Sequence, residues 1–120
     1  MLAGASRFHI LILVALMLVA AIQPVSAMRG RCTLQVDGKS YINGPCDIDM
    51  QQGGSFQISP VIKRGTYFAT VQIDKDAGNA MGFWNGVNAE SHAHDELGTL
   101  VRQGACWVNS RAKVCATAGR

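Results

Sequence analysis

The sequence predicts an all-β domain, either a small antiparallel barrel or a sandwich, stapled by two disulfides. Three observations lead to this fold class. Short runs of alternating apolar and polar residues recur after residue 27, turns containing glycine separate most of them, and all four cysteines lie in the same part of the 120-residue chain. No segment in this region carries a helical apolar period over three turns, so helices are not expected.

The start of the chain has the three-part pattern of a cleavable secretion signal. Arg7 supplies a basic start, residues 10–22 are an unbroken apolar run, and Val25-Ser26-Ala27 places small residues where a signal peptidase cuts. The run of about 13 residues is shorter than the roughly 20 that a membrane-spanning helix needs. We therefore predict a signal peptide over residues 1–27, one domain over residues 28–120, no stable membrane anchor after cleavage, and a periplasmic or secreted location.

Eight segments are predicted as strands, which is a maximum count because neighbouring segments can merge. Their alternation is clearest over residues 67–73, where Tyr67, Ala69, Val71 and Ile73 share one face, as in a half-buried strand. The predicted strands cover residues 33–36, 39–42, 55–59, 67–73, 80–84, 99–102, 105–108 and 112–116.

The four cysteines predict two disulfides, because an even set in a small exported domain is typical of a disulfide framework. The Asp37-Gly38 pair is a type I′ turn signal that brings Cys32 close to Asn43, and a further turn at Gly44-Pro45 would return the next cysteine beside it. A two-residue loop at residues 110–111 places the last two cysteines opposite each other. We predict the pairs Cys32–Cys46 and Cys106–Cys115, with the crossed pairings as alternatives. A four-cysteine zinc site lacks the closely spaced cysteine pair that such sites use.

Charge and motif content exclude several classes of function. Of eleven Lys and Arg residues in the full chain, Arg7 lies in the leader, so ten remain against eight Asp and Glu. The basic residues are scattered and not interleaved with aromatics, so a nucleic-acid partner is not predicted. The chain has no Gly-x-Ser-x-Gly motif, and its cysteines are predicted to be oxidised, so we predict that it is not an enzyme.

One segment offers metal-ligand chemistry. His92 and His94 are two residues apart, so on a strand their imidazoles face the same way, and Asp95 or Glu96 adds a carboxylate. No cofactor is predicted, and the alternative is zinc at His92, His94 and Glu96 in an envelope enzyme. The competing interpretation is a solvated loop in which the rings only cap neighbouring carbonyl groups.

A second segment offers aromatic recognition. Phe83-Trp84-Asn85-Gly86 places adjacent rings on opposite faces of a strand just before a tight turn, so one ring is expected in the core and the other at the surface. A tryptophan at a strand end is an efficient anchor for a sugar or a protein surface. Trp84 and Asn85 are therefore predicted to bind a partner, whereas Trp107 is predicted to be a core residue.

A small exported β domain with a cystine near each end resembles the periplasmic inhibitors of c-type lysozyme from Gram-negative bacteria. The segment Phe83-Trp84-Asn85-Gly86 is similar to the strand and turn of that family. The resemblance implies an antiparallel barrel that blocks a lysozyme cleft. The serine and basic residues of the family's loop have no counterpart in residues 77–81, so no inhibitory residue is carried over by position.

These observations together predict an exported binding protein that acts by surface contact, either inhibiting a lysozyme-like hydrolase or binding envelope glycans. Because a carboxylate-lined cleft attracts cations, Lys63, Arg64 and Arg102 are added to the predicted binding residues. The expected partner is a protein or a glycan, and the domain is expected to act as a monomer or a homodimer. The alternatives are the zinc enzyme and a structural factor of the envelope.

Overall fold

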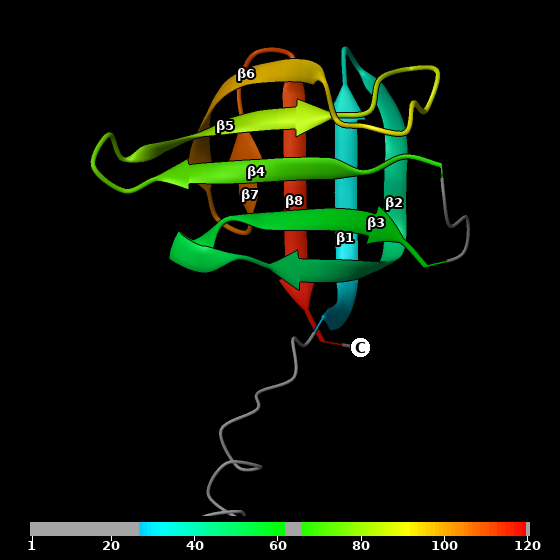
Figure 1. Cartoon of the computed structure of the whole chain (residues 1–120), viewed down its shortest axis with the longest axis horizontal. Helices are drawn as coiled ribbons and strands as arrows, with labels where there is room; N and C mark the ends of the chain where they lie inside the picture. Colours follow the sequence, from blue (N-terminus) through cyan, green and yellow to red (C-terminus); the bar gives the residue numbers. More distant parts are fainter. Residues whose placement is uncertain (1–26, 62–65, 120) are drawn as a thin grey trace, which may run out of the picture.

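Eight strands, each paired with its neighbours in chain order, close into an antiparallel barrel in the computed structural model of the protein (Figure 1). The barrel closes where β8 pairs with β1, so no strand of the described chain keeps an open edge. This confirms the predicted all-β class, and each of the eight predicted segments overlaps one strand. The strands are β1 (Met28–Val36), β2 (Lys39–Met50), β3 (Phe56–Pro60), β4 (Ala69–Asp74), β5 (Asn79–Trp84), β6 (Asp95–Gln103), β7 (Cys106–Val108) and β8 (Ala112–Ala118), with a 3₁₀ turn, η1 (Gln52–Gly54), between β2 and β3.

The structure describes residues 27–61 and 66–119. The predicted signal peptide, apart from Ala27, and the predicted binding residues Lys63 and Arg64 lie outside these ranges. Within them, no helix has the length and apolar character required to cross a membrane.

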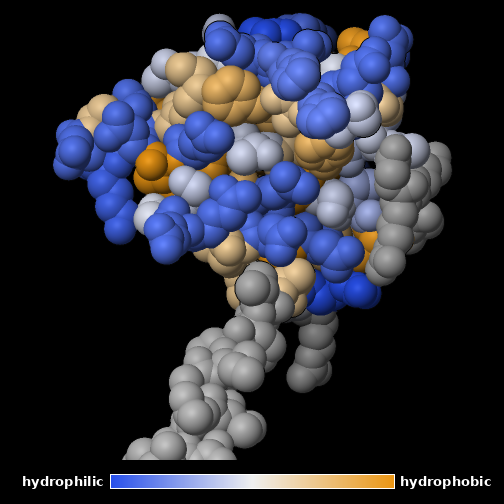
Figure 2. Space-filling view, viewed as in Figure 1, coloured by the Kyte–Doolittle hydropathy of each residue, from blue (hydrophilic) through white to orange (hydrophobic). Residues whose placement is uncertain are grey.

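The core follows from the alternation in the sequence. In Figure 1, β3, β4 and β5 cross in front of β1, β2 and β8 at a steep angle. The buried hydrophobic residues of all eight strands form one core cluster. Ala69 and Val71 of β4 are fully buried, whereas the next residue, Gln72, is exposed, as the period of two predicts. Figure 2 shows the other phase, with hydrophilic side chains over most of the visible face.

The two predicted tight hairpins are present. Asp37 and Gly38 both have positive φ, +52° and +79°, as a type I′ turn requires, and they join Val36 to Lys39. In the last hairpin Trp107 faces Val114, which leaves the predicted two-residue loop at residues 110–111.

The predicted turn at Gly44-Pro45 is wrong, because β2 continues straight through both residues. Gly44 has a φ of +143°, which glycine tolerates, and Pro45 stays in register with Arg31 of β1. β1 begins at Met28, earlier than its sequence pattern indicated, so it pairs with β2 along this whole stretch. Pairing between distant strands therefore overrides the local turn signal.

Both predicted disulfides are confirmed, and they occupy different positions. Cys32 faces Gly44 in the ladder, so its bridge to Cys46 runs diagonally inside the barrel, where both cysteines are buried and their Cα atoms are 5.7 Å apart. Cys106 faces Cys115 directly, with a Cα separation of 4.0 Å, and this bridge is half-buried on the outside of the hairpin. Two disulfides and no free cysteine indicate an oxidising, extracytoplasmic environment.

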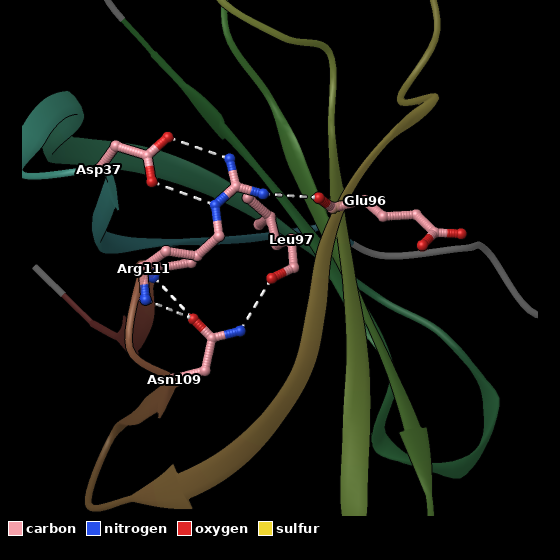
Figure 3. A network of polar contacts seen from close by, with 6 residues as sticks. Asp37, Glu96, Leu97, Asn109 and Arg111 are labelled. Carbon is pink, nitrogen blue, oxygen red and sulfur yellow. Dashed lines mark hydrogen bonds and ion pairs between the residues drawn. The ribbon is translucent and has the colours of Figure 1, made fainter.

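A polar network joins three elements at one end of the barrel (Figure 3). The Arg111 guanidinium donates two hydrogen bonds of 3.1 Å to the Asp37 carboxylate and one of 3.0 Å to the main-chain oxygen of Glu96. The Asn109 amide donates to the main-chain oxygen of Leu97 at 2.8 Å, and its own oxygen accepts from the main-chain N–H of Arg111 at 2.9 Å. The network fixes the turn between β1 and β2 against the turn between β7 and β8 and the start of β6.

The network predicts a pH-dependent contribution to stability. The hydrogen bonds from Arg111 hold the pKa of the Asp37 carboxyl below its ordinary value of 3.8. Because the folded-state pKa is depressed, the contribution is present above the unfolded-state value and is lost as the pH falls through the folded-state value. Titration of the Asp37 carboxyl carbon by NMR should give a midpoint below 3.8, and Arg111→Met should raise it. Arg29→Met, which removes the separate pair with Asp47, is the control; an unchanged Asp37 midpoint in Arg111→Met would contradict the assignment.

Candidate functional site

A groove of about 530 Å3 opens where β2 begins, β3 ends and the chain enters β4. Its volume is in the range of small-molecule sites. We call it the tyrosine groove, because the rings of Tyr41 and Tyr67 are its aromatic surface. It is lined by Lys39, Ser40, Tyr41, Ile42, Asn43, Gly44, Pro45, Pro60, Thr66, Tyr67 and Val87.

Three aromatic rings pack together behind and along this groove. Tyr41 meets Tyr67 edge-on at 4.9 Å between ring centroids and meets Trp84 edge-on at 4.6 Å, while Tyr67 and Trp84 stack at 6.1 Å. Both tyrosines are half-buried, whereas only 2% of Trp84 is exposed. The cluster thus presents the two tyrosines outward against a buried tryptophan.

The predicted surface role of Trp84 is therefore wrong. Trp84 shares its strand face with Ala80 and Gly82, and all three are buried, so the period of β5 directs the ring into the barrel. Its neighbour Phe83 lies on the other face and is partly exposed. Trp84 supports the groove from behind instead of touching a partner.

Asn85 was also predicted to bind a partner, and it too is buried, with 1% of its surface exposed. Its side-chain oxygen accepts from the main-chain N–H of Phe68 at 2.9 Å, and its amide donates to the main-chain oxygens of Thr66 at 2.6 Å and Glu90 at 3.0 Å. Thr66 and Phe68 are the two neighbours of Tyr67. Asn85 therefore clamps the backbone on both sides of Tyr67 and sets the position of that ring.

A further hydrogen bond fixes the tip of Tyr67. Its hydroxyl donates to the main-chain oxygen of Val87 at 2.9 Å, in the turn that follows Asn85. That turn depends on Gly86, which has a φ of +79°. A Cβ atom added at this glycine would lie 2.7 Å from the Asp95 carboxylate. Since backbone and tip are both held, Tyr67 presents a rigid ring to the groove.

Tyr41 reaches the groove through a β-bulge. The register between β1 and β2 passes from Leu34 opposite Ile42 to Gln35 opposite Ser40, so Tyr41 is the extra residue. A bulge of this kind re-aims a side chain relative to the regular pleat. The Tyr41 side chain is half-buried and lines the groove.

The charges around the groove are few. Lys39 is the one charged residue in the described lining, and the side chains of Ser40 and Asn43 are exposed, uncharged hydrogen-bonding groups beside the tyrosines. The described lining therefore combines aromatic faces with neutral donors and acceptors.

The predicted zinc ligands do not form a metal site in the described chain. The rings of His92 and His94 stack with centroids 5.3 Å apart, and Ser91 Oγ lies 3.0 Å from His92 Nδ1. The pair lies in the loop before β6, whereas Glu96 lies on β6 and directs its exposed carboxylate away from the network in Figure 3. No group of three His, Cys, Asp or Glu side chains in residues 27–61 and 66–119 is arranged to hold a metal.

Arg102 lies at the other end of the barrel from the tyrosine groove. Its Nε donates to the main-chain oxygen of Gly104 at 3.2 Å, and its guanidinium carbon lies 5.9 Å from the ring centroid of Trp107. Trp107 is 7% exposed and belongs to the core, as predicted. Of the predicted binding residues that the structure describes, Trp84 and Asn85 lie at one end of the barrel and Arg102 lies at the other.

Tyr41 and Tyr67, which line the groove, were not among the binding residues predicted from the sequence. Tyr67 was assigned to a strand face, and Tyr41 to the strand after the Asp37-Gly38 turn, and both positions are typical of core residues. A comparison of the chain with models of protein families, with curated proteins and with solved structures finds no significant match.

Proposed function

We propose that this protein is an exported, disulfide-stapled binding protein that takes a glycan chain in the tyrosine groove. The observation that carries the proposal is the pair of tyrosine rings, held in place by Trp84 and Asn85 beside neutral hydrogen-bonding side chains. The proposal places the protein in the periplasm or outside the cell.

A glycan fits this chemistry better than a charged ligand. A sugar ring offers an apolar face that packs on an aromatic ring and a rim of hydroxyl groups that need neutral donors and acceptors. Tyr41 and Tyr67 offer the aromatic faces, while Ser40 and Asn43 offer the polar contacts. Because Tyr67 is already fixed, binding loses little side-chain entropy there.

Recognition, not bond cleavage, is the activity that we propose. The described lining holds no aspartate, glutamate or histidine, and the protein has no free cysteine. General acid–base or thiolate catalysis would need such a group within reach of the ligand. Inhibition of a lysozyme-like hydrolase stays a prediction from the sequence.

The proposal is tested by calorimetric titration of the exported protein with an oligomer of N-acetylglucosamine. Tyr67→Ala and Tyr41→Ala should each weaken binding at least about tenfold, since anchoring aromatics carry much of the free energy at such sites. Tyr41→Phe, which keeps the ring, should lose less. Val101→Ala, at an exposed residue of β6 that does not line the groove, is the matched control.

Two results would overturn this function. The first is the absence of heat from the wild-type protein at millimolar glycan. The second is binding of a proline-rich peptide, but not the glycan, to the same tyrosines, because aromatic grooves also recognise such peptides.

A further inference from the structure

A second cleft, of about 490 Å3, lies at the opposite end of the barrel from the tyrosine groove. It forms where β1 begins, where β2, β4, β6 and β8 end, and where β3 and β7 begin. We call it the methionine cleft. Its apolar walls come from Met28, Ile48, Met50, Phe56, Ile73 and Trp107.

The walls of this cleft are inward-phase residues, and the two methionines among them are left exposed at the ends of their strands. Ile48 is buried, and Met50, two residues further along the same face of β2, is 46% exposed. Met28 of β1 is 38% exposed. Exposed methionines are flexible and adapt to apolar ligands of varied shape. An apolar ligand in the cleft would remove both side chains from water.

The charges in the cleft have one sign. Lys75 and Arg102 are its charged lining residues, and no aspartate or glutamate joins them in the described lining. The ion pairs of the described chain are Arg29–Asp47 and Arg111–Asp37, so neither cation is neutralised by a carboxylate there. The cleft thus combines an apolar interior with a cationic rim.

Arg102 is positioned for an anion. Its Nε is occupied by the main-chain oxygen of Gly104, and its guanidinium lies over Trp107, so the side chain is held at the rim. These contacts do not use the two terminal nitrogens of the guanidinium, Nη1 and Nη2. The two nitrogens form a planar fork that suits a carboxylate. Cleavage after Ala27, as the sequence predicts, would add the α-ammonium group of Met28 at the same end.

We propose that the methionine cleft binds a single-chain amphiphile with an anionic headgroup, such as a medium-chain fatty acid. The alkyl chain occupies the space between Met28, Met50 and Trp107, and the carboxylate lies between Lys75 and Arg102. This site is separate from the tyrosine groove and does not depend on the glycan proposal.

The test is a titration of the full exported protein with decanoate, kept below the concentration at which it aggregates, followed by calorimetry and by tryptophan emission. The protein has two tryptophans, and Trp107 lines this cleft. The emission change should therefore persist in Trp84→Phe. Decanol and decylamine, which lack the negative charge, should bind at least about tenfold more weakly than decanoate.

Two variants separate the two parts of the site. Arg102→Gln should weaken decanoate binding about tenfold or more, because it removes the guanidinium proposed to bind the carboxylate. The fold should be kept, since the Arg102 side chain is exposed. Met50→Glu should abolish binding by placing a charge on the apolar wall. Lys113→Gln, at an exposed lysine of β8 outside the cleft, is the matched control and should bind like the wild type.

Three outcomes would overturn the proposal. They are no binding of decanoate to the wild type, equal binding of decanoate and decylamine, and binding to anionic vesicles without binding to monomeric decanoate. The last would make this end of the barrel a membrane-docking surface. Glycan titrations of the same variants keep this result separate from the function of the tyrosine groove.

Discussion

Replacement of Cys32 and Cys46 together by alanine is expected to lower the free energy of unfolding by about 3–5 kcal/mol. The bridge closes a 14-residue separation, for which the lost constraint on the unfolded chain is about 3 kcal/mol. Both cysteines are buried, so removing the sulfur atoms also leaves space between β1 and β2 in the core. Urea denaturation monitored by circular dichroism measures the change.

The second disulfide is the internal control for this prediction. Cys106–Cys115 closes a shorter separation of nine residues and is half-buried on the outside of its hairpin. Replacement of this pair by alanine should lower the free energy of unfolding by about 1 kcal/mol less than replacement of Cys32 and Cys46, because less packing is lost. Equal losses for the two pairs, or a larger loss for Cys106–Cys115, would contradict the inference that burial of Cys32–Cys46 adds to its stabilising effect.

Asn85→Ala is expected to lower the free energy of unfolding by a similar amount, about 2–4 kcal/mol. The change removes three hydrogen bonds and leaves the N–H of Phe68 and the oxygens of Thr66 and Glu90 without the partner that Asn85 supplies. Because Asn85 holds the backbone around Tyr67, affinity for the glycan should also fall, although Asn85 does not line the groove. Thermal unfolding and the glycan titration measure the two effects.

Asn85→Asp tests the same clamp through pH. The new oxygen would replace the amide that donates to Thr66 and Glu90, and burial among carbonyl oxygens raises the pKa of a carboxyl. With a raised folded-state pKa, the variant should be most stable below the unfolded-state value near 4 and lose stability as the pH rises. The wild type should show no such loss over the same range, and a variant as stable as the wild type at pH 7.5 would contradict the clamp.

The sequence was sufficient for the all-β fold class because the decisive signals are local, but it left the choice between barrel and sandwich open. Three signals each act over a few residues. They are the alternation around Val71, the positive φ that Asp37-Gly38 favours, and the short hairpin that aligns Cys106 with Cys115. The continuation of β2 through Gly44-Pro45 was not predictable in this way. It depends on pairing with the start of β1, a stretch that the sequence-based prediction placed outside the first strand.

The candidate site was only partly predictable, because it depends on barrel closure. Tyr41, Tyr67 and Trp84 come from three parts of the chain and meet only once β2, β4 and β5 are in register. The predicted exposure of Trp84 and Asn85 was wrong, since both side chains turn inward. The period of β5 separates Phe83 from Trp84, but because both phases of this strand hold apolar residues, the sequence did not show which of the two rings enters the core.

The most direct test of the tyrosine groove as the glycan site is a map of amide chemical-shift changes in ¹⁵N-labelled protein during titration with the N-acetylglucosamine oligomer. We expect the largest saturable changes at Tyr41, Asn43, Tyr67 and Val87, and none at Arg102 or Trp107. Saturable changes confined to the methionine-cleft end, or none at all, would contradict the account.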